Sequence, residues 1–123
     1  MAQKVTTAMI TGASTGIGAV YADRLAKRGH DLVLVARNAE RLDQLAARLR
    51  AETGVSVDVM VADLTNSTDL ARVEHRLQED AAIDLLINNA GSTLSGAFAE
   101  QDVDQVDWLI RLNVTAVTRL AHA

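Results

Sequence analysis

Residues 11–18, with the sequence TGASTGIG, constrain the fold of this chain more than any other segment. They follow the apolar, β-branched residues 5–10 and open a segment with helical spacing of apolar side chains. Glycine lets the backbone turn sharply and approach a ligand without a Cβ in the way. The free amides and the positive dipole end of the next helix then face a negative charge. A strand, a glycine turn and a helix start in this order indicate a site for a dinucleotide phosphate.

Short apolar runs alternate with longer segments of helical period along the chain. The expected strands are residues 5–10, 32–36, 55–61 and 83–88, and the expected helices are residues 16–28, 39–52, 67–80 and 102–122. This alternation predicts a parallel sheet with right-handed crossovers. The fold class we expect is therefore α/β, a Rossmann-like three-layer αβα arrangement of about four strands, in the order 3-2-1-4, and four helices.

Local signals support these element boundaries. Asn38 stands where a helix N-cap is expected, and Gly29 and Gly54 stand where C-terminal caps are expected. The runs at residues 32–36 and 83–88 are almost continuously apolar, as in parallel strands that are covered on both faces.

The last expected helix has apolar residues on two sides. At 100° per residue, one broad apolar stripe is predicted to be buried. It consists of Val103, Val106, Ile110, Val114, Val117 and Ala121, and Asn113 lies inside it. Trp108 and Leu112 lie on the opposite, otherwise polar side. Exposed apolar groups on a second helix face often meet another subunit, so we expect a homo-oligomer.

The composition limits the class of protein. A chain of 123 residues with 49% hydrophobic residues is expected to form a single globular domain, residues 1–123. Its net charge of −4 does not favour nucleic acid, and without cysteine it has no thiolate metal site; we expect no metal. We find no secretory signal and no transmembrane stretch, and we expect no membrane contact and a cytoplasmic location.

The end of the second expected strand indicates which cofactor is preferred. An NAD site carries an Asp or Glu there, which accepts hydrogen bonds from the ribose hydroxyls. Here the strand ends in Ala36 and is followed by Arg37, and the nearest carboxylate is Glu40, inside the next helix. The planar cation of arginine suits a 2′-phosphate. NADP(H) is therefore expected in preference to NAD(H), the alternative being that Arg37 only solvates the end of the strand.

The chain resembles the short-chain dehydrogenase/reductase family along essentially its whole length. Residues 11–18 are similar to the family's TGxxxGIG cofactor loop, and residues 88–91 match its NNAG element. The Asp63-Leu64 pair resembles the pair that contacts the adenine ring, and Asn113 falls where the asparagine of the catalytic tetrad falls. Four ordered matches are far more specific than one glycine loop.

The resemblance implies a role for each matching residue. Asn113 would be catalytic, Arg37 would select the 2′-phosphate, and Asp63 and Leu64 would frame the adenine. The remaining cofactor-binding residues would be Gly12, Ser14, Thr15, Gly16, Ile17 and Gly18 along the pyrophosphate and adjacent ribose, and Asn89, Ala90 and Gly91 along the ribose side. Three alternatives stay open: Gly18 serves close helix packing only, Asn88 ties strands together, and Asp63 does helix-capping work.

Family chemistry transfers a hydride between NADP(H) and a carbonyl or alcohol carbon. It implies a tyrosine as acid or base, a lysine four residues later, and a serine on the substrate oxygen. The chain stops at Ala123 before those positions, and its single tyrosine, Tyr21, is followed four residues later by Leu25. We therefore expect the cofactor-binding half of such an oxidoreductase, truncated and incomplete at its C-terminus, with a small carbonyl or alcohol as substrate.

The sequence leaves two other functions open. A non-catalytic nucleotide-binding or assembly module is compatible with the absent tyrosine and lysine. A methyltransferase-like binder shares a glycine loop, but the basic Arg37 replaces the carboxylate that its ribose site would need.

Overall fold

The computed structural model describes residues 6–14, 16–90 and 103–123, and within these it confirms the alternation of strands and helices. The elements follow one another in the order β1 (Thr7–Thr11), α1 (Gly16–Lys27), β2 (Asp31–Ala36), α2 (Ala39–Thr53), β3 (Val57–Val61), α3 (Ser67–Glu79), β4 (Ile83–Ile87), α4 (Val103–Ile110), the π-helical segment η2 (Arg111–Ala116) and α5 (Val117–His122).

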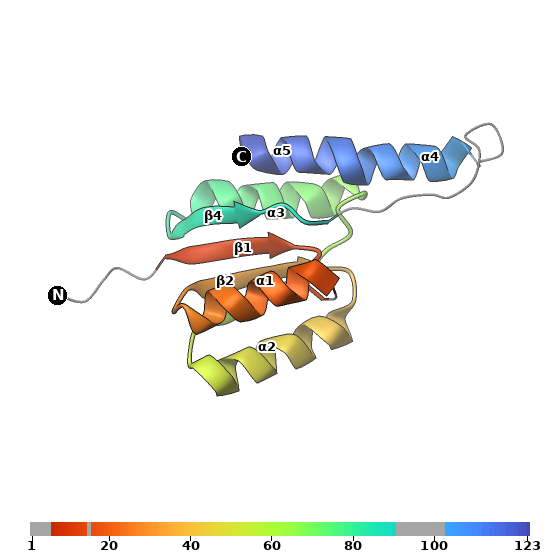
Figure 1. The fold of residues 1–123 in the computed structure, drawn as a ribbon. Coiled ribbons are helices and arrows are strands. Elements are labelled where there is room, and N and C mark those ends of the chain that lie inside the picture. The colour runs from red at the N-terminus through yellow and green to blue at the C-terminus, as the bar shows by residue number, and fades with distance from the viewer. Residues whose placement is uncertain (1–5, 15, 91–102) are drawn as a thin grey trace.

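The four strands form one parallel sheet in the order β3-β2-β1-β4, as the sequence predicts. In the centre of the sheet, Leu32 of β2 pairs with Ala8 of β1 on one side and with Val57 of β3 on the other. The helices lie on both faces of the sheet, which gives the expected three layers (Figure 1).

Each face of the sheet has its own hydrophobic core because side chains alternate along a strand. Ala8 and Ile10 of β1 point into the core under α1 and α2, whereas Met9 points into the core under α3 and α5. On β2, Leu34 points into the first of these cores and Val35 into the second. Burial on both faces explains why these strands are continuously apolar.

The predicted caps are present. Asn38 accepts a hydrogen bond from the amide of Arg41 and begins α2, and Gly54 ends it in the left-handed region at φ 76°. Gly29 ends α1 at φ 91°. Its amide donates to Ala26 O at 3.0 Å while the amide of His30 donates to Leu25 O at 3.1 Å, the pair of bonds of a Schellman motif.

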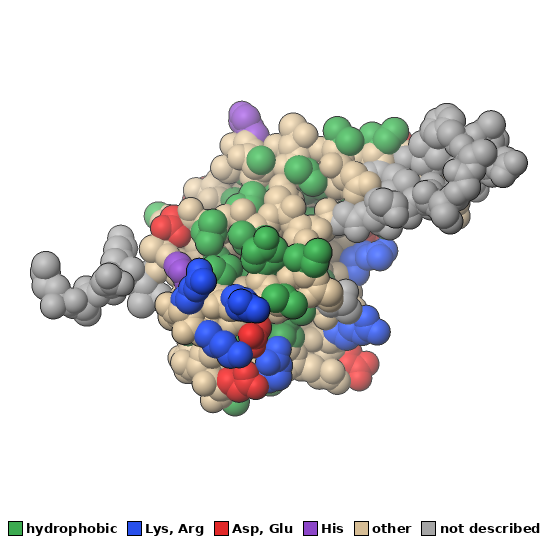
Figure 2. Space-filling view, viewed as in Figure 1, with side chains coloured by type: hydrophobic (Ala, Val, Ile, Leu, Met, Phe, Trp, Pro, Cys, Tyr) green, Lys and Arg blue, Asp and Glu red, His purple; other side chains and the backbone are tan. Residues whose placement is uncertain are grey.

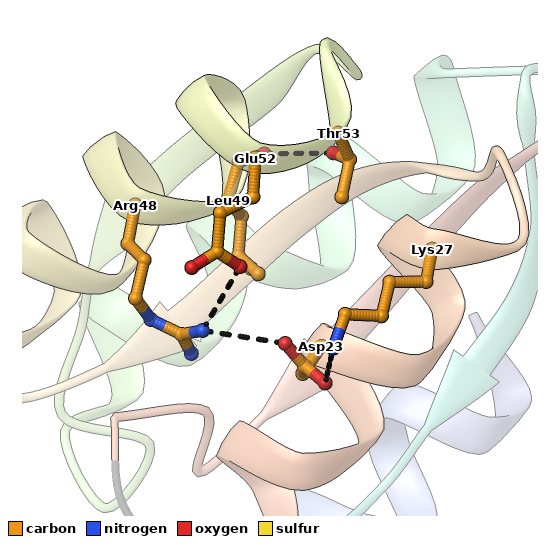
Figure 3. A network of polar contacts seen from close by, with 6 residues as sticks. All are labelled: Asp23, Lys27, Arg48, Leu49, Glu52 and Thr53. Carbon is orange, nitrogen blue, oxygen red and sulfur yellow. Dashed lines mark hydrogen bonds and ion pairs between the residues drawn. The ribbon is translucent and has the colours of Figure 1, made fainter.

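Charged side chains join α1 to α2 on the protein surface (Figure 3). Arg48 of α2 lies 3.3 Å from Asp23 of α1 and 3.2 Å from Glu52, and Lys27 lies 3.0 Å from the other oxygen of Asp23. The Lys27 ammonium, more than Arg48, holds the pKa of Asp23 below its usual value. Pairs as exposed as these add little stability, so apolar packing is the main attachment of the two helices.

The predicted burial of the last helix is wrong. Val103, Ile110 and Val114 are 77%, 50% and 56% exposed, whereas Ala116 and Leu120 are buried and Leu112 packs against the same core. Two apolar faces compete in this helix, and the face that meets β1 and α3 is the buried one. The π-helical hydrogen-bond pattern of η2 also rotates side chains away from a uniform 100° step.

Two polar contacts attach α5 to the rest of the fold. Arg119 pairs with the buried Glu74 of α3, which raises the pKa of Arg119. The side-chain amide of Asn88, after β4, donates to Val117 O at 2.9 Å. Asn88 thus ties β4 to the last helix, a structural role of the kind left open above.

Hydrophobic side chains gather on the exposed side of α1, across the middle of the face in Figure 2. Ile17, Val20 and Tyr21 are 66%, 54% and 45% exposed there, and they line a shallow groove together with Ile87 of β4. Among the described residues, no helix is long and apolar enough to span a bilayer.

Candidate cofactor-binding site

A pocket of about 400 Å³ opens at the carboxyl ends of the strands. Every strand contributes the residues that follow it: Gly12 after β1, Arg37 after β2, Asp63 after β3 and Asn89 after β4. Among the described residues, the lining is Gly12, Ser14, Val35, Ala36, Arg37, Asn38, Arg41, Ala62, Asp63, Leu64, Asn89, Ala90, Trp108 and Leu112. Open parallel sheets bind ligands at this edge, where the strand order reverses.

The buried hydroxyl of Thr11 joins the glycine loop to the segment after β4. Thr11 Oγ1 accepts hydrogen bonds from the amides of Asn89 at 3.0 Å and Ala90 at 2.9 Å. The side-chain amide of Asn89 reaches Gly12 O at 3.4 Å. Two segments far apart in the sequence are therefore fixed side by side along one wall of the pocket.

Two glycines of the loop have no room for a side chain. A Cβ on Gly18 would lie 2.1 Å from Gly12 O, and a Cβ on Gly12, at φ +65°, would lie 3.1 Å from Ala90 Cα. Gly18 therefore allows α1 to approach the loop closely, which is the packing role left open for it. Gly16, at φ +59°, has open space beside it, and this leaves the start of α1 accessible to a phosphate.

Two arginines lie at the end of β2. Arg37 and Arg41 both line the pocket, and neither forms an ion pair within the part of the chain that the structure describes. Arg41 lies in the first turn of α2, where the helix dipole disfavours a cation. The guanidinium carbon of Arg37 lies 5.6 Å from the centre of the Trp108 ring. Among the described residues, no carboxylate therefore forms an ion pair with the positive charge at this end of the pocket.

Asp63 both lines the pocket and shapes the loop after β3. Its Oδ1 accepts from Thr65 N at 3.0 Å and from Thr65 Oγ1 at 2.6 Å, and its own amide donates to Asp69 Oδ2 at 2.9 Å. This amide, more than Arg72, lowers the pKa of Asp69. The N-cap of α3 is Asn66. Asp63 therefore organises the loop without capping the helix itself.

The structure brings most of the predicted site residues together. Gly12, Ser14, Arg37, Asp63, Leu64, Asn89 and Ala90 line the pocket, and Gly18 lies buried behind the loop. Gly16 and Ile17 are exposed at the start of α1 and outside the lining. Asn113 is exposed in η2, also outside the lining. Thr15 and Gly91 lie outside the described residues.

Arg41, Trp108 and Leu112 are among the pocket residues that sequence reasoning missed. Arg41 could have been found, since it follows Arg37 by four positions across a predicted helix start. Trp108 and Leu112 are expected at a subunit contact, which stays a prediction; within the chain, Leu112 packs on the core and both residues line the pocket. Nothing in their spacing shows that they line a pocket together with the residues that follow β2 and β3.

Comparison with known proteins places this arrangement in a family. The family model for short chain dehydrogenases matches residues 6–123. The chain is 34% identical over 121 residues to the very-long-chain 3-oxoacyl-CoA reductase of Anas platyrhynchos, a match that covers 94% of this chain and 38% of that protein.

Two solved structures are also similar. The bulky-bulky ketone specific alcohol dehydrogenase from Comamonas testosteroni is 58% identical with a TM-score of 0.96, and the match covers 98% of this chain and 48% of that one. A short-chain dehydrogenase from Sphingobium yanoikuyae, in complex with NADPH, is 61% identical with a TM-score of 0.94, and the match covers 96% and 46%. The chain thus spans about half the length of these two proteins.

Proposed function

Because the chain belongs to the short-chain dehydrogenase family, we propose that it binds NADP(H), in preference to NAD(H), in the pocket at the strand ends. The bound cofactor would serve hydride transfer to or from a small carbonyl or alcohol substrate. We further propose that residues 1–123 form a single nucleotide-binding domain.

One observation carries the cofactor preference. Arg37 and Arg41 face the pocket without a carboxylate partner among the described residues, at the strand end where an NAD site needs a carboxylate. A 2′-phosphate supplies the absent negative charge and accepts charge-assisted hydrogen bonds from a guanidinium. The NADPH in the Sphingobium yanoikuyae relative supports the same assignment.

The other predicted residues take roles along the cofactor in this proposal. The loop residues Gly12, Ser14, Thr15, Gly16, Ile17 and Gly18 would surround the pyrophosphate and the adjacent ribose. Asp63 and Leu64 would frame the adenine, and Asn89, Ala90 and Gly91 would lie along the ribose. Asn113 would organise a proton relay from η2. The cofactor supplies the hydride, and the protein positions it.

Calorimetric titration of the purified chain with NADPH and NADH tests the cofactor preference. We expect NADPH to bind more tightly than NADH. Arg37→Ala should lower the affinity for NADPH about ten- to a hundredfold, because hydrogen bonds to a charged group are lost. The affinity of Arg37→Ala for NADH should change little. Arg41→Ala should also lower the affinity for NADPH.

Arg48→Ala is the matched control, since Arg48 lies on α2, as Arg41 does, but outside the pocket. It should leave both affinities unchanged. Equal affinity of the unmodified chain for NADPH and NADH would contradict the assignment.

A second candidate function, a non-catalytic nucleotide-binding module, is favoured by one observation. The single tyrosine, Tyr21, lies on α1 in the apolar groove with Ile17 and Val20, and the residue four positions later is the buried Leu25. Tyr21 is therefore not placed to exchange a proton in the pocket. Carbonyl reduction by the purified chain separates the two functions.

A further inference from the structure

Trp108 reaches the cofactor pocket from a distant part of the sequence. It is the only tryptophan in the chain, it is partly buried on α4, and it lines the pocket beside Leu112. The guanidinium carbon of Arg37 lies over its ring at 5.6 Å from the centre, within the range of a cation–π contact. Among the described residues, this ring is the only side chain with which Arg37 forms a polar or cation–π contact.

An indole is a suitable partner for an arginine that must bind phosphate. A carboxylate partner would occupy the guanidinium N–H groups and cancel the charge. An aromatic ring contacts the flat face of the guanidinium and leaves the N–H groups at its edge free to donate. The contact also limits the rotamers of an exposed side chain, so that less conformational entropy is lost when the ligand binds.

We propose that Trp108 is a positioning residue for cofactor selection: it holds the guanidinium of Arg37 ready for the 2′-phosphate of NADP(H). The inference rests on the proposed function, because Arg37 must first be the residue that recognises this phosphate. The new element is that α4, through Trp108, takes part in cofactor selection together with Arg37, which follows β2.

A ring that only forms a wall of the pocket would behave differently. A wall contributes to the binding of every ligand with an adenosine group, whether or not the 2′-phosphate is present. A positioning residue contributes to the difference between the two ligands and acts only while Arg37 is present. The preference for the 2′-phosphate is therefore the quantity to measure.

The test compares two probes that differ by one group, adenosine 2′,5′-bisphosphate and adenosine 5′-monophosphate. The ratio of their dissociation constants is measured by calorimetry on the full chain, on Trp108→Leu, which keeps apolar bulk, and on Trp108→Phe, which keeps an aromatic ring. We expect the preference for the bisphosphate to fall about two- to fivefold in Trp108→Leu, the strength of an exposed cation–π contact. In Trp108→Phe the preference for the bisphosphate should fall less, because an aromatic ring is kept.

Two controls separate positioning from a general effect on the fold. In an Arg37→Ala background, Trp108→Leu should not lower the preference further, because the group that it positions is gone. Ile110→Ala, half exposed on α4 and outside the pocket, should leave the ratio unchanged. Thermal unfolding followed by circular dichroism checks that each variant is folded.

The outcomes also separate this inference from the proposed function. If the unmodified chain prefers the bisphosphate and Trp108→Leu retains that preference in full, the cofactor assignment stands and the inference is overturned. If Trp108→Leu lowers the affinity for both probes equally, the inference is overturned as well, since Trp108 then only forms a wall of the pocket. If the unmodified chain has no preference for the bisphosphate, the NADP assignment itself fails.

Discussion

Gly18 is the residue at which the fold leaves least room for a side chain. Its backbone is ordinary helix, so the requirement for glycine is steric: a Cβ would lie 2.1 Å from Gly12 O and 2.8 Å from the amide nitrogen of the Asn89 side chain. At Gly16 the requirement is conformational instead, because φ is +59° and nothing lies within 4 Å of the Cβ position. One loop thus uses two glycines for two different physical reasons.

Gly18→Ala should therefore destabilise the chain, by about 1–3 kcal/mol for overpacking against a backbone that has no free volume. It should also disturb the loop that faces the pocket. Urea unfolding measures the loss, with Gly16→Ala as the comparison that adds backbone strain without a collision. A Gly18→Ala chain as stable as the unmodified one would show that α1 moves away from the loop without cost.

At the scale of the elements, the signals that act between near neighbours were the most reliable. Asn38 and Gly54 cap α2, and all four strands lie within two residues of the expected bounds. The last helix was different. Its apolar residues occupy two faces, and periodicity does not tell which of them meets the core. Leu112, Ala116 and Leu120 are the ones that pack there, and η2 interrupts the regular step on which the expectation depended.

The connection from β3 to α3 is the element whose stability should depend on acid. The Asp63 amide and the Arg72 guanidinium bind the carboxylate of Asp69 and hold its pKa below the ordinary 3.8. The unfolded chain then takes up the proton first as the pH falls, so stability is fully present above about pH 4 and is lost as the pH falls through the folded pKa.

Asp69→Asn should consequently be less stable than the unmodified chain at neutral pH, and its stability should change less on acidification to about pH 3. Denaturant unfolding at several pH values measures both effects. Asp43→Asn, an exposed carboxylate on α2, is the matched control. An identical acid dependence in Asp69→Asn and the unmodified chain would rule out this account.

At the scale of the whole molecule, the pocket exists because four strand ends and one helix meet. Gly12, Arg37, Asp63 and Asn89 each follow a different strand, and α4 adds Trp108. The groups that line this pocket are suited to holding a dinucleotide. The lining residues that the structure describes include no tyrosine, lysine or histidine to exchange a proton with a substrate.

The purified 123-residue chain should therefore bind NADPH without reducing a carbonyl compound. Absorbance of NADPH, followed over time with a panel of ketones and aldehydes, measures this, and a full-length relative serves as the positive control. Turnover above the uncatalysed rate that survives Tyr21→Phe would show that another group supplies the proton. Turnover that Tyr21→Phe abolishes would contradict the placement of Tyr21 outside the pocket.

The order of elements, the parallel sheet, the glycine loop and the position of Arg37 follow from the amino-acid sequence alone, because each depends on near neighbours or on the alternation of strands and helices. The sequence also carried the family resemblance, which the comparisons confirm. The folded chain alone shows which face of the last helix is buried and that Trp108 joins Arg37 at the pocket. The physical reason is that these contacts join segments whose separation is fixed by packing across the sheet, for which local periodicity holds no information.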